Sequence, residues 1–311
     1  MTQPSFDQLK AEIQTSRIID GKRVATYIKE KAKADMALDG DARAPRLDVI
    51  LVGDNPASAT YVRNKQKACQ EVGIDCVIHH YPAEVGESEV GEDIKTLNEN
   101  PEVDGIFIQL PLPDHLDDHY LVNLIDPHKD VDGFGMHNEA LTASANPFDL
   151  TTHSPCTPLG ICYLLSTLDI PTGSHVVIIG RSDIVGKPLS RMLLNLDYTV
   201  TTCHSKTKDL KKFTQHADVI VVAVGKALFL KADMVKPGAI VIDVGINYIE
   251  VDGKRKLVGD VDFDQVLPLV SHITPVPGGV GPLTVACLML NTVWARRRQL
   301  AGQAVHQILA K

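Results

Sequence analysis

The stretch VVIIGRSDIVGKPLS, residues 176–190, decides the fold. Its first four residues are all apolar and β-branched, as in a strand that is covered on both faces of a parallel sheet. Gly180 ends this strand, and we expect a helix to begin near Gly186. A strand, a glycine turn and a helix in this order open a doubly wound α/β domain. The turn presents backbone N–H groups and the positive end of a helix dipole to one place, which suits a phosphate group.

The spacing of the glycines is not that of the common nucleotide-binding fingerprints. A dinucleotide fingerprint has the form G-x-G-x-x-G, whereas this turn has the form G-x-x-x-x-x-G. It is not a P-loop either, because Lys187 is followed by Pro188 instead of Ser or Thr. The turn therefore indicates a phosphate-binding α/β domain by its position after the strand and not by its motif.

The end of the next expected strand indicates which cofactor this domain prefers. Proteins that select NAD place an acidic residue about 20 positions beyond the first glycine, where it binds the ribose 2′-hydroxyl. Here the strand over 198–203 is followed by His204, Ser205 and Lys206, and Arg181 lies in the first turn. Hydroxyl and cationic donors suit a 2′-phosphate, so the sequence predicts NADP. The alternative is that Arg181 and Lys206 are ordinary solvated charges.

Short apolar runs alternate with helical patterns along the whole chain. This alternation predicts two three-layer α/β domains with mostly parallel sheets, the second of them Rossmann-like. An irregular zone rich in Pro, Asn, Thr and Ser separates the two series. We expect a first domain over 1–145, a dinucleotide-binding domain over 146–283, and a last helix over 284–311 that packs back on the first domain. The expected strands are 46–52, 76–81, 104–110, 174–180, 198–203, 217–225 and 239–245, and the expected helices include 59–73, 88–99 and 186–196.

The composition limits the class of protein. The chain has 311 residues, of which 44% are hydrophobic and 23% charged, which is enough for two cores. The formal net charge of -8 argues against a general affinity for nucleic acid or an anionic membrane. The longest apolar run, ADVIVVAV, is far shorter than the roughly 20 residues that cross a bilayer. The 6 cysteines form no C-x-x-C pair, which fits reduced thiols in the cytoplasm.

The helix expected over 59–73 carries a charge on its apolar face. Lys65 points toward the interior or a site, because it shares the apolar stripe at the helical period. The alternative is a lysine whose stem packs on apolar surface while its head reaches water. Gln109 falls at the carboxyl end of a buried strand, the edge where open α/β sheets bind ligands. The stripe consists of Ser58, Tyr61, Val62, Lys65, Cys69 and Val72.

A series of segments carries a more specific signal: YVRNK, GIFIQLPLP, HKDVDGF, PCTP, GRSDIVGKP, HSKT, DVGIN, VGDVDF and TPVPGGVGP. In this order they resemble one family, the bifunctional methylenetetrahydrofolate dehydrogenase/cyclohydrolase enzymes of one-carbon metabolism. The resemblance runs from about Ile18 to Trp294. It implies NADP-dependent oxidation of 5,10-methylenetetrahydrofolate to 5,10-methenyltetrahydrofolate, followed by hydrolysis to 10-formyltetrahydrofolate. It also implies two α/β domains with a cleft between them, NADP in the second, tetrahydrofolate derivatives as partners, and a homodimer.

The resemblance implies roles for single residues. Lys65 matches the catalytic lysine, Tyr61 its helix neighbour in the folate pocket, and Gln109 the hydrogen-bond partner of the lysine. Asp132 matches the aspartate that binds the pterin. The loop that covers the folate falls on Pro277, Gly278 and Gly279, and the dinucleotide contacts fall on Gly180, Arg181, Ser182, Ser205 and Ile246. No metal site is expected, since His115 and His119, at i and i+4, lack a third ligand.

Two other functions remain open at this stage. The chain could be a non-catalytic NADP-binding scaffold, although the set of Lys65, Gln109 and Asp132 argues against it. It could also be a dehydrogenase for a different small substrate, such as a hydroxy acid or a shikimate-like compound. Folate binding would decide against the second alternative.

Overall fold

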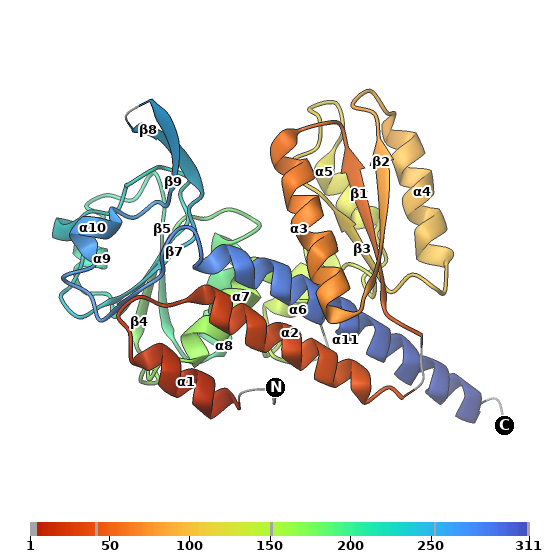
Figure 1. Cartoon of the computed structure of the whole chain (residues 1–311), viewed down its shortest axis with the longest axis horizontal. Coiled ribbons are helices and arrows are strands. Elements are labelled where there is room, and N and C mark those ends of the chain that lie inside the picture. The colour runs from red at the N-terminus through yellow and green to blue at the C-terminus, as the bar shows by residue number, and fades with distance from the viewer. Residues whose placement is uncertain (1–4, 41–42, 150–151, 252, 310–311) are drawn as a thin grey trace. The chain divides into compact units, whose positions relative to one another are not determined.

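The computed structural model describes residues 5–40, 43–149, 152–251 and 253–309, and Figure 1 traces the chain. The chain divides into two compact units, and each is described by itself. Unit 1 consists of Met1–Tyr27, Ala143–Phe148 and Thr157–Thr284. Unit 2 consists of Ile28–Thr142, Asp149–Cys156 and Val285–Lys311. The chain passes between the units five times, first within helix α2 (Gly21–Ala37) and last within helix α11 (Val280–Leu309).

The sheet of unit 2 consists of three parallel strands in the order β2-β1-β3. All three strands were predicted from the sequence, and each is confirmed. The strands are β1 (Arg46–Val52), β2 (Asp75–Tyr81) and β3 (Gly105–Ile108). The helices are α3 (Pro56–Val72), α4 (Glu87–Glu99), α5 (Asp118–Leu124) and α6 (Met136–Thr142).

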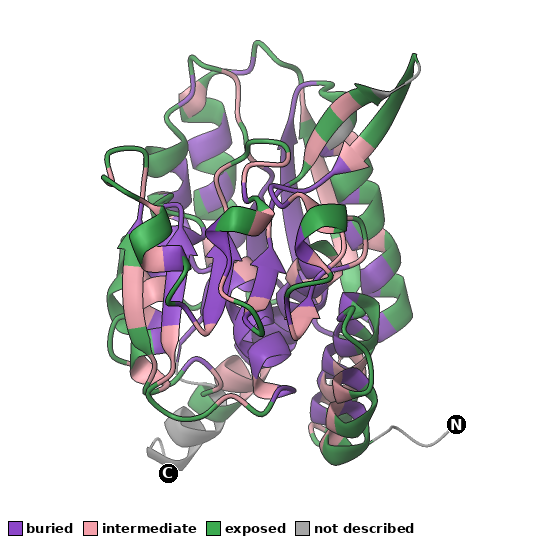
Figure 2. Cartoon of the chain, turned by 90° about the vertical axis from the view of Figure 1, so that its left-hand side faces the viewer, coloured by how far each residue is buried: buried purple, intermediate pink, exposed green. Residues whose placement is uncertain are grey.

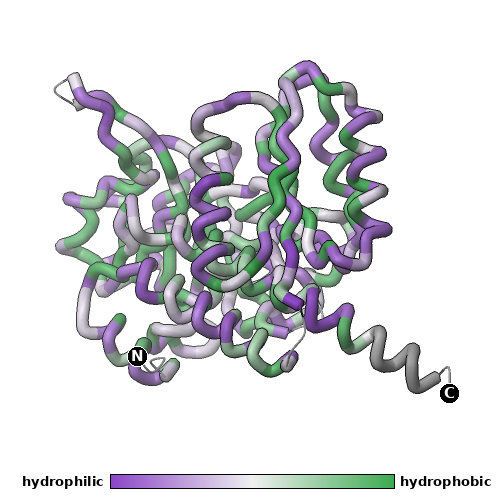
Figure 3. The backbone as a smooth tube through the Cα atoms, turned by 45° about the vertical axis from the view of Figure 1, so that its right-hand side comes forward, coloured by the Kyte–Doolittle hydropathy of each residue, from purple (hydrophilic) through white to green (hydrophobic). Residues whose placement is uncertain are grey.

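The alternation of side chains along β1 and β3 separates the two faces of this sheet. Even-numbered residues such as Ile50 and Ile106 pack in one core with Ile94 of α4 and Leu121 of α5. Odd-numbered residues of β3, among them Phe107, therefore point to the opposite face. In Figure 3 the surface helices alternate between hydrophobic and hydrophilic positions, as expected for helices that cover a sheet with one side only.

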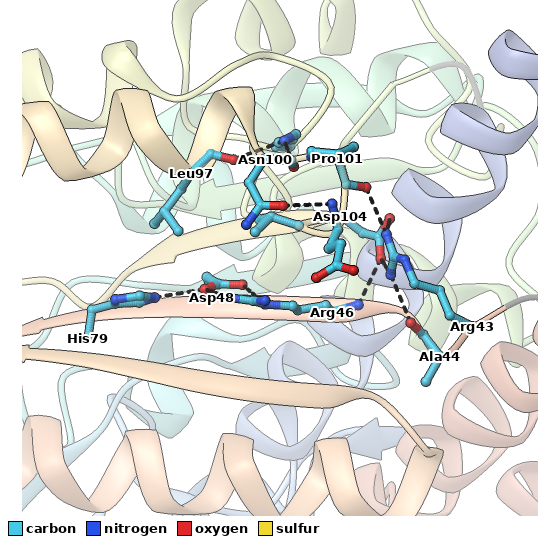
Figure 4. A network of polar contacts seen from close by, with 12 residues as sticks. Arg43, Ala44, Arg46, Asp48, His79, Leu97, Asn100, Pro101 and Asp104 are labelled. Atoms are coloured by element: carbon cyan, nitrogen blue, oxygen red, sulfur yellow. Dashed lines mark hydrogen bonds and ion pairs between the residues drawn. The ribbon is translucent and has the colours of Figure 1, made fainter.

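Paired charges close the amino-terminal edge of the same sheet (Figure 4). Asp48 is fully buried, accepts hydrogen bonds from Arg46 at 2.8 and 2.9 Å, and lies 2.7 Å from His79 Nε2. Asp104 is also fully buried and accepts two hydrogen bonds from the Arg43 guanidinium, at 2.7 and 3.0 Å. The backbone N–H of Arg46 donates to it as well, at 2.8 Å. Each buried carboxylate thus has a cationic partner and several donors, the arrangement that buried charge requires.

Unit 1 holds a five-stranded parallel sheet in the order β10-β7-β6-β4-β5. The first four strands in chain order were predicted, and the mixed α/β class with mostly parallel sheets is confirmed. Figure 2 shows the inner strands β4, β6 and β7 largely buried, whereas most residues of the edge strand β5 are partly or fully exposed. The strands are β4 (His175–Ile179), β5 (Thr199–Cys203), β6 (Val219–Val222), β7 (Ile240–Asp243) and β10 (His272–Ile273).

The remaining elements of unit 1 are short. Helix α8 begins at Gly186, as predicted, and an antiparallel hairpin of β8 and β9 follows β7. The helices are α1 (Phe6–Gln14), α7 (Cys156–Ser166), α8 (Gly186–Asn195), α9 (Lys211–Thr214), η1 (Ala232–Met234) and α10 (Phe263–Val266), and the hairpin strands are β8 (Asn247–Val251) and β9 (Lys254–Val258).

The N-terminal segment departs from the predicted domain boundary, because residues up to Tyr27 group with unit 1 and not with the first domain. The N–H of Ile19 donates to the carbonyl of Ile273 at 2.8 Å, and the N–H of Ile273 donates to the carbonyl of Arg17 at 2.8 Å. The segment therefore extends the edge of the sheet beside β10. Such pairing joins residues far apart in sequence, and the local apolar pattern does not reveal it.

The residues of α11 from Val285 onward group with unit 2. The indole N–H of Trp294 donates to Asp35 Oδ2 at 2.9 Å, and both side chains are buried. Within the described ranges, no helix is long and apolar enough to cross a membrane.

Candidate functional site

Lys65 and Gln109 meet at the carboxyl-terminal edge of the unit 2 sheet. Lys65 lies on α3, and Gln109 directly follows the last residue of β3. The Lys65 ammonium donates to Gln109 Oε1 at 2.8 Å, so the hydrogen bond expected between these side chains is present. Gln109 is held in turn, because its Nε2 donates to the carbonyl of Leu110 at 2.7 Å and its backbone N–H to the carbonyl of Ile50 at 2.9 Å. Both side chains are buried, with 7% of Lys65 and 8% of Gln109 exposed.

The surroundings of Lys65 disfavour its charged form. Burial lowers the pKa of Lys65 to about 8, and the nearby Asp132 carboxylate opposes part of this shift. The amide oxygen of Gln109 carries no charge. The centroid of the Phe107 ring lies 3.5 Å from Nζ, a cation–π contact that offsets part of the cost of burying the charge. An amine in this state is suited to exchange protons near neutral pH.

Asp132 lies in a turn that Asp130 organises. The fully buried Asp130 carboxylate accepts hydrogen bonds from the backbone N–H of Gly133 at 3.0 Å and of Gly135 at 2.8 Å. Asn138 Nδ2 donates to it at 2.9 Å. Gly133 has φ +71, and a Cβ there would lie 2.4 Å from the carbonyl oxygen of His153, so glycine is required at this position. The turn is therefore fixed from within and against the segment before Cys156.

The Asp132 carboxyl is itself perturbed. Burial raises the pKa of Asp132 to about 6, whereas the charge of Lys65 and a hydrogen bond with Cys156 lower it. Lys65 and Asp132 therefore act on each other's pKa, and the structure brings together three of the predicted residues: Lys65, Gln109 and Asp132.

Two neighbours of Lys65 were not predicted from the sequence. Phe107 could have been found, because it lies two positions before Gln109 on the same face of β3. Cys156 stands in the quoted PCTP segment, but nothing in that pattern marks its thiol. Burial raises the pKa of this thiol well above its ordinary value, and the Asp132 carboxylate adds to the shift. Cys156 is thus a neutral thiol beside the Asp132 carboxyl.

The other residues predicted for folate binding have different positions. Tyr61 lies one helical turn before Lys65 on α3 and is 41% exposed. Pro277, Gly278 and Gly279 belong to unit 1. Gly278 has φ +106, and a Cβ on Gly21 would lie 1.8 Å from the carbonyl oxygen of Gly279, so this loop packs closely on the start of α2.

The residues predicted for the dinucleotide gather at one edge of the unit 1 sheet. Gly180, Ser205 and Ile246 follow the last residues of β4, β5 and β7, and these strands are parallel. Gly180 has φ +133, and a Cβ there would lie 2.2 Å from the carbonyl oxygen of Ala223. A Cβ on Gly186 would lie 2.2 Å from the carbonyl oxygen of Gly180. The turn therefore admits only glycine at both places, and this leaves its backbone close to any group bound there.

The polar side chains at this edge fit a phosphorylated ligand. Arg181 and Ser182 are exposed in the turn after β4, and Ser205 and Lys206 are exposed after β5, the neighbouring strand. No ion pair of Arg181 occurs within the described residues. These four side chains can supply hydroxyl and cationic donors to a phosphate.

Two buried carboxylates hold this edge in place and were missed from the sequence. Asp260 accepts hydrogen bonds from the N–H groups of Val224, Gly225 and Lys226 at 2.7, 2.9 and 2.8 Å. Asp243, at the end of β7, accepts from the N–H of Gly245 at 2.9 Å. Burial raises the pKa of Asp243 to about 6. These bonds fix the loops that follow β6 and β7.

A cavity lies elsewhere in unit 1. It has a volume of about 750 Å³ and is lined by residues before or at the start of the unit 1 strands, among them Ser174, Asp218, Lys236 and His272. It therefore lies at the amino-terminal edge of the sheet, opposite Gly180, and includes none of the predicted site residues.

His115 and His119 do not share a helix, because α5 begins at Asp118. His115 Nε2 lies 3.0 Å from the carbonyl oxygen of Val85. Among the described residues, no group of three or more His, Cys, Asp or Glu side chains is arranged to hold a metal ion.

Comparison with known proteins assigns a family to both halves of the chain. The catalytic domain of tetrahydrofolate dehydrogenase/cyclohydrolase matches residues 19–132, and the NAD(P)-binding domain of the same enzymes matches residues 155–300. The match to the NAD(P)-binding domain includes the turn at Gly180, and the match to the catalytic domain includes Lys65, Gln109 and Asp132.

Individual relatives agree over most of the chain. A protein from a Polaromonas species named bifunctional protein FolD is 48% identical over 91% of this chain and 99% of its own length. The crystal structure of FolD from Campylobacter jejuni, 48% identical, has a TM-score of 0.84 and covers 90% of this chain and 98% of its own. FolD from Trypanosoma brucei, solved with NADP and an inhibitor, is 35% identical, with a TM-score of 0.84 and coverage of 91% and 98%. The chain therefore belongs to the tetrahydrofolate dehydrogenase/cyclohydrolase family.

Proposed function

We propose that this chain oxidises 5,10-methylenetetrahydrofolate with NADP and then hydrolyses the 5,10-methenyl product to 10-formyltetrahydrofolate. The observation that carries the proposal is the buried Lys65 amine, hydrogen-bonded at 2.8 Å to a neutral partner and lowered in pKa to about 8. The family membership and the glycine-only turn at Gly180 support it.

NADP, when bound, supplies the acceptor for the hydride that leaves the bridging methylene carbon of the folate. The contribution of the chain to this step is to bind and orient the folate and to exclude water. Asp132 accepts hydrogen bonds from the amino and ring N–H groups of the pterin, a bidentate contact that fixes the plane of the ring. Tyr61, Pro277, Gly278 and Gly279 are assigned as further folate contacts on the strength of the family resemblance.

Lys65 acts in the second step as a proton acceptor and donor. With a pKa of about 8, roughly one amine in ten is neutral at pH 7. A cationic methenyl group nearby favours the neutral form further, since like charges disfavour each other. The neutral amine takes a proton from the attacking water and returns it to the folate nitrogen as the C–N bond breaks, and the remaining hydroxyl proton is released to solvent as the formyl C=O forms. Gln109 orients the amine, because its oxygen accepts one N–H and leaves the lone pair free to point elsewhere.

Cofactor contacts are assigned to Gly180, Arg181, Ser182, Ser205 and Ile246. Among these residues, the exposed Arg181 guanidinium is the main hydrogen-bond donor to the 2′-phosphate of NADP. The substitution Arg181→Ala is therefore expected to lower the affinity for NADP about tenfold and the affinity for NAD less than about twofold. An equal loss of affinity for the two cofactors would show that Arg181 does not bind the 2′-phosphate.

The active form is proposed to be a cytoplasmic homodimer with no nucleic-acid or membrane partner. The net charge of -8 supports the absence of nucleic-acid and anionic membrane partners, and the free cysteines support the compartment. The homodimer is assigned on the strength of the family resemblance. Light scattering at micromolar concentration tests the dimer, and a monomer mass would contradict it.

A direct assay tests the proposed function. The purified protein receives methylenetetrahydrofolate and NADP, and absorbance follows NADPH and the methenyl intermediate. We expect NADPH to form and the methenyl product to disappear faster than it does without protein. NADPH formation without accelerated hydrolysis would refute the second activity. Absence of both, with calorimetric NADP binding intact, would favour a non-catalytic scaffold or a dehydrogenase for another substrate.

A further inference from the structure

Asn291 is a fully buried polar side chain on α11, within the part of this helix that belongs to unit 2. Its neighbours along the helix, such as Leu288, Leu290 and Val293, are buried and apolar. An amide in such surroundings is costly unless its polar atoms are paired. The Oδ1 of Asn291 is buried without a hydrogen-bond partner among the described residues, so the NH₂ end carries the contacts of this side chain. Asn291 Nδ2 donates to the carbonyl oxygen of Val131 at 2.9 Å and to that of Ser154 at 3.0 Å.

These two hydrogen bonds join segments that are far apart in the sequence. Val131 is the residue before Asp132, and Ser154 lies two residues before Cys156. The Cys156 thiol donates to the same Val131 carbonyl at 3.5 Å, and Asn291 Nδ2 lies 3.7 Å from its sulfur. Asn291 therefore lies where the peptide carrying Asp132 and the peptide carrying Cys156 meet.

The chemistry of these contacts specifies an amide. Both partners are carbonyl oxygens, which only accept, so the NH₂ end of the side chain must face them. Leucine has a similar shape but no donor, and the shorter serine side chain carries a single donor. Neither can join both carbonyls.

The residue next to Asn291 on α11 offers a contrast. Thr292, the next residue, is also fully buried, but its Oγ1 donates to the carbonyl of Leu288 at 2.8 Å, within the helix itself. Thr292 therefore offers a control for the loss of a buried hydrogen bond on this helix without loss of a link to the turn.

We propose that Asn291 is a positioning residue that holds the Asp132 carboxylate in the orientation in which it binds the pterin. The proposal rests on the proposed function, since it assigns Asn291 a role toward the folate-binding carboxylate. The turn is fixed from within by Asp130 and at its Val131 end by Asn291. A bidentate contact depends on the direction of the carboxylate, so loosening that end weakens folate binding more than it slows the chemistry at Lys65.

The test compares Asn291→Leu with Thr292→Val in the full-length protein. For Asn291→Leu we expect KM for methylenetetrahydrofolate to rise about tenfold while kcat changes less than threefold. For Thr292→Val we expect KM to stay within twofold of the parent, although the protein is less stable. Asn291→Ser serves as a second variant and decides the question if Asn291→Leu does not fold by circular dichroism.

A double-mutant cycle distinguishes an effect on the position of the Asp132 carboxylate from a general effect on the folded protein. In an Asp132→Asn background the carboxylate is gone, so Asn291→Leu should raise KM less than twofold. Calorimetry with tetrahydrofolate gives the same cycle for binding alone.

Three results would overturn the inference: an unchanged KM in the Asn291 variants, a tenfold rise that persists in the Asp132→Asn background, or an equal rise in Thr292→Val. A parent protein without folate turnover would overturn the proposed function and this inference with it. A parent protein with normal turnover and Asn291 variants with parental KM would overturn this inference alone.

Discussion

The buried charges at the two edges of the unit 2 sheet have different hydrogen-bond partners. At the amino-terminal edge, Asp48 and Asp104 are fully buried, and arginine guanidinium groups donate directly to each of them (Figure 4). At the carboxyl-terminal edge, the Lys65 ammonium is almost as deeply buried, but the group that accepts its hydrogen bond is the neutral Gln109 amide. The pKa of Arg46 is raised by its hydrogen bonds to Asp48, whereas burial lowers that of Lys65 to about 8.

The charges at the amino-terminal edge stabilise the fold, whereas the amine at the carboxyl-terminal edge is suited to proton transfer. A buried ion pair with several donors keeps one protonation state and contributes to a defined fold. A buried amine with a neutral partner has two protonation states of similar free energy near neutral pH, which general acid and base catalysis requires. The two arrangements lie at opposite edges of one parallel sheet, and open α/β sheets in general bind ligands at the carboxyl ends of their strands.

The largest effect is expected from Lys65→Met, which removes the amine and keeps most of its volume. Cyclohydrolase kcat should fall about 10³-fold, within the range for loss of a general acid or base. Lys67→Met, on the exposed side of the same helix, is the matched control and should keep parental kcat. Stopped-flow absorbance of methenyltetrahydrofolate measures both, and undiminished turnover in Lys65→Met would remove Lys65 from the mechanism.

At the opposite edge, Asp104→Asn should affect stability and not chemistry. It leaves the Arg43 guanidinium without its carboxylate and should lower the free energy of unfolding by about 3 kcal/mol, at the low end for a broken buried pair because Arg43 is partly exposed. Glu92→Gln, which breaks the exposed pair with Lys95, should leave the free energy of unfolding nearly unchanged. Urea unfolding measures both. A loss of turnover per folded molecule in Asp104→Asn would contradict the separation of the two edges.

Gln109→Glu would make the carboxyl edge resemble the amino edge. A carboxylate at the position of Gln109 favours the charged amine and should raise the pKa of Lys65 above about 8 by roughly 1 to 3 units. The neutral fraction at pH 7 then falls, so cyclohydrolase kcat at pH 7 should drop about tenfold or more and recover at higher pH. Gln70→Glu adds the same charge on the exposed side of α3 and should leave the pH profile in place. An unshifted profile in Gln109→Glu would contradict the role given to the neutral partner.

The smallest expected effect is a gain of stability in Lys65→Met. The pKa of Lys65 falls from 10.5 to about 8 in the folded protein, so the unfolded chain binds more protons between these pH values and stability rises with pH there. Below pH 8 the folded state carries the full cost of the buried charge. Removing it, less the lost contacts with Gln109 and Phe107, should raise the free energy of unfolding at pH 7 by about 1 kcal/mol. Urea titrations at pH 7 and 9.5 test this, and a marked destabilisation would show that the charge is well compensated.

Local pattern was sufficient to predict most strands of the two parallel sheets and the glycine turn. β1, β2 and β4 were predicted because apolar and β-branched runs bounded by turn residues are local signals. Lys65 stood out because the helical period placed a charge on an apolar stripe. Its bond to Gln109 came from the family resemblance, since no periodicity joins residues 44 positions apart.

Pairing between residues far apart in the chain could not be predicted from the sequence pattern. The N-terminal segment joins the sheet beside β10 through backbone hydrogen bonds. Because such bonds do not depend on the side chain, no side-chain pattern indicates this pairing. Asn291 and Asp260 act through side chains on distant backbone groups. Asp260 lies in the quoted VGDVDF segment, but no local pattern indicates which backbone groups its carboxylate binds. Phe107 alone had a local signal, the strand period that places it on the face of Gln109.

The most direct test is a titration of the Lys65 amine itself. Lysine labelled with ¹³C at Cε gives one resonance for each residue, and the signal absent from Lys65→Met identifies Lys65. We expect its chemical shift to follow a single transition near pH 8 in the ligand-free protein. A transition above pH 10, as for a solvated lysine, would contradict the claim that this amine is held ready to exchange protons.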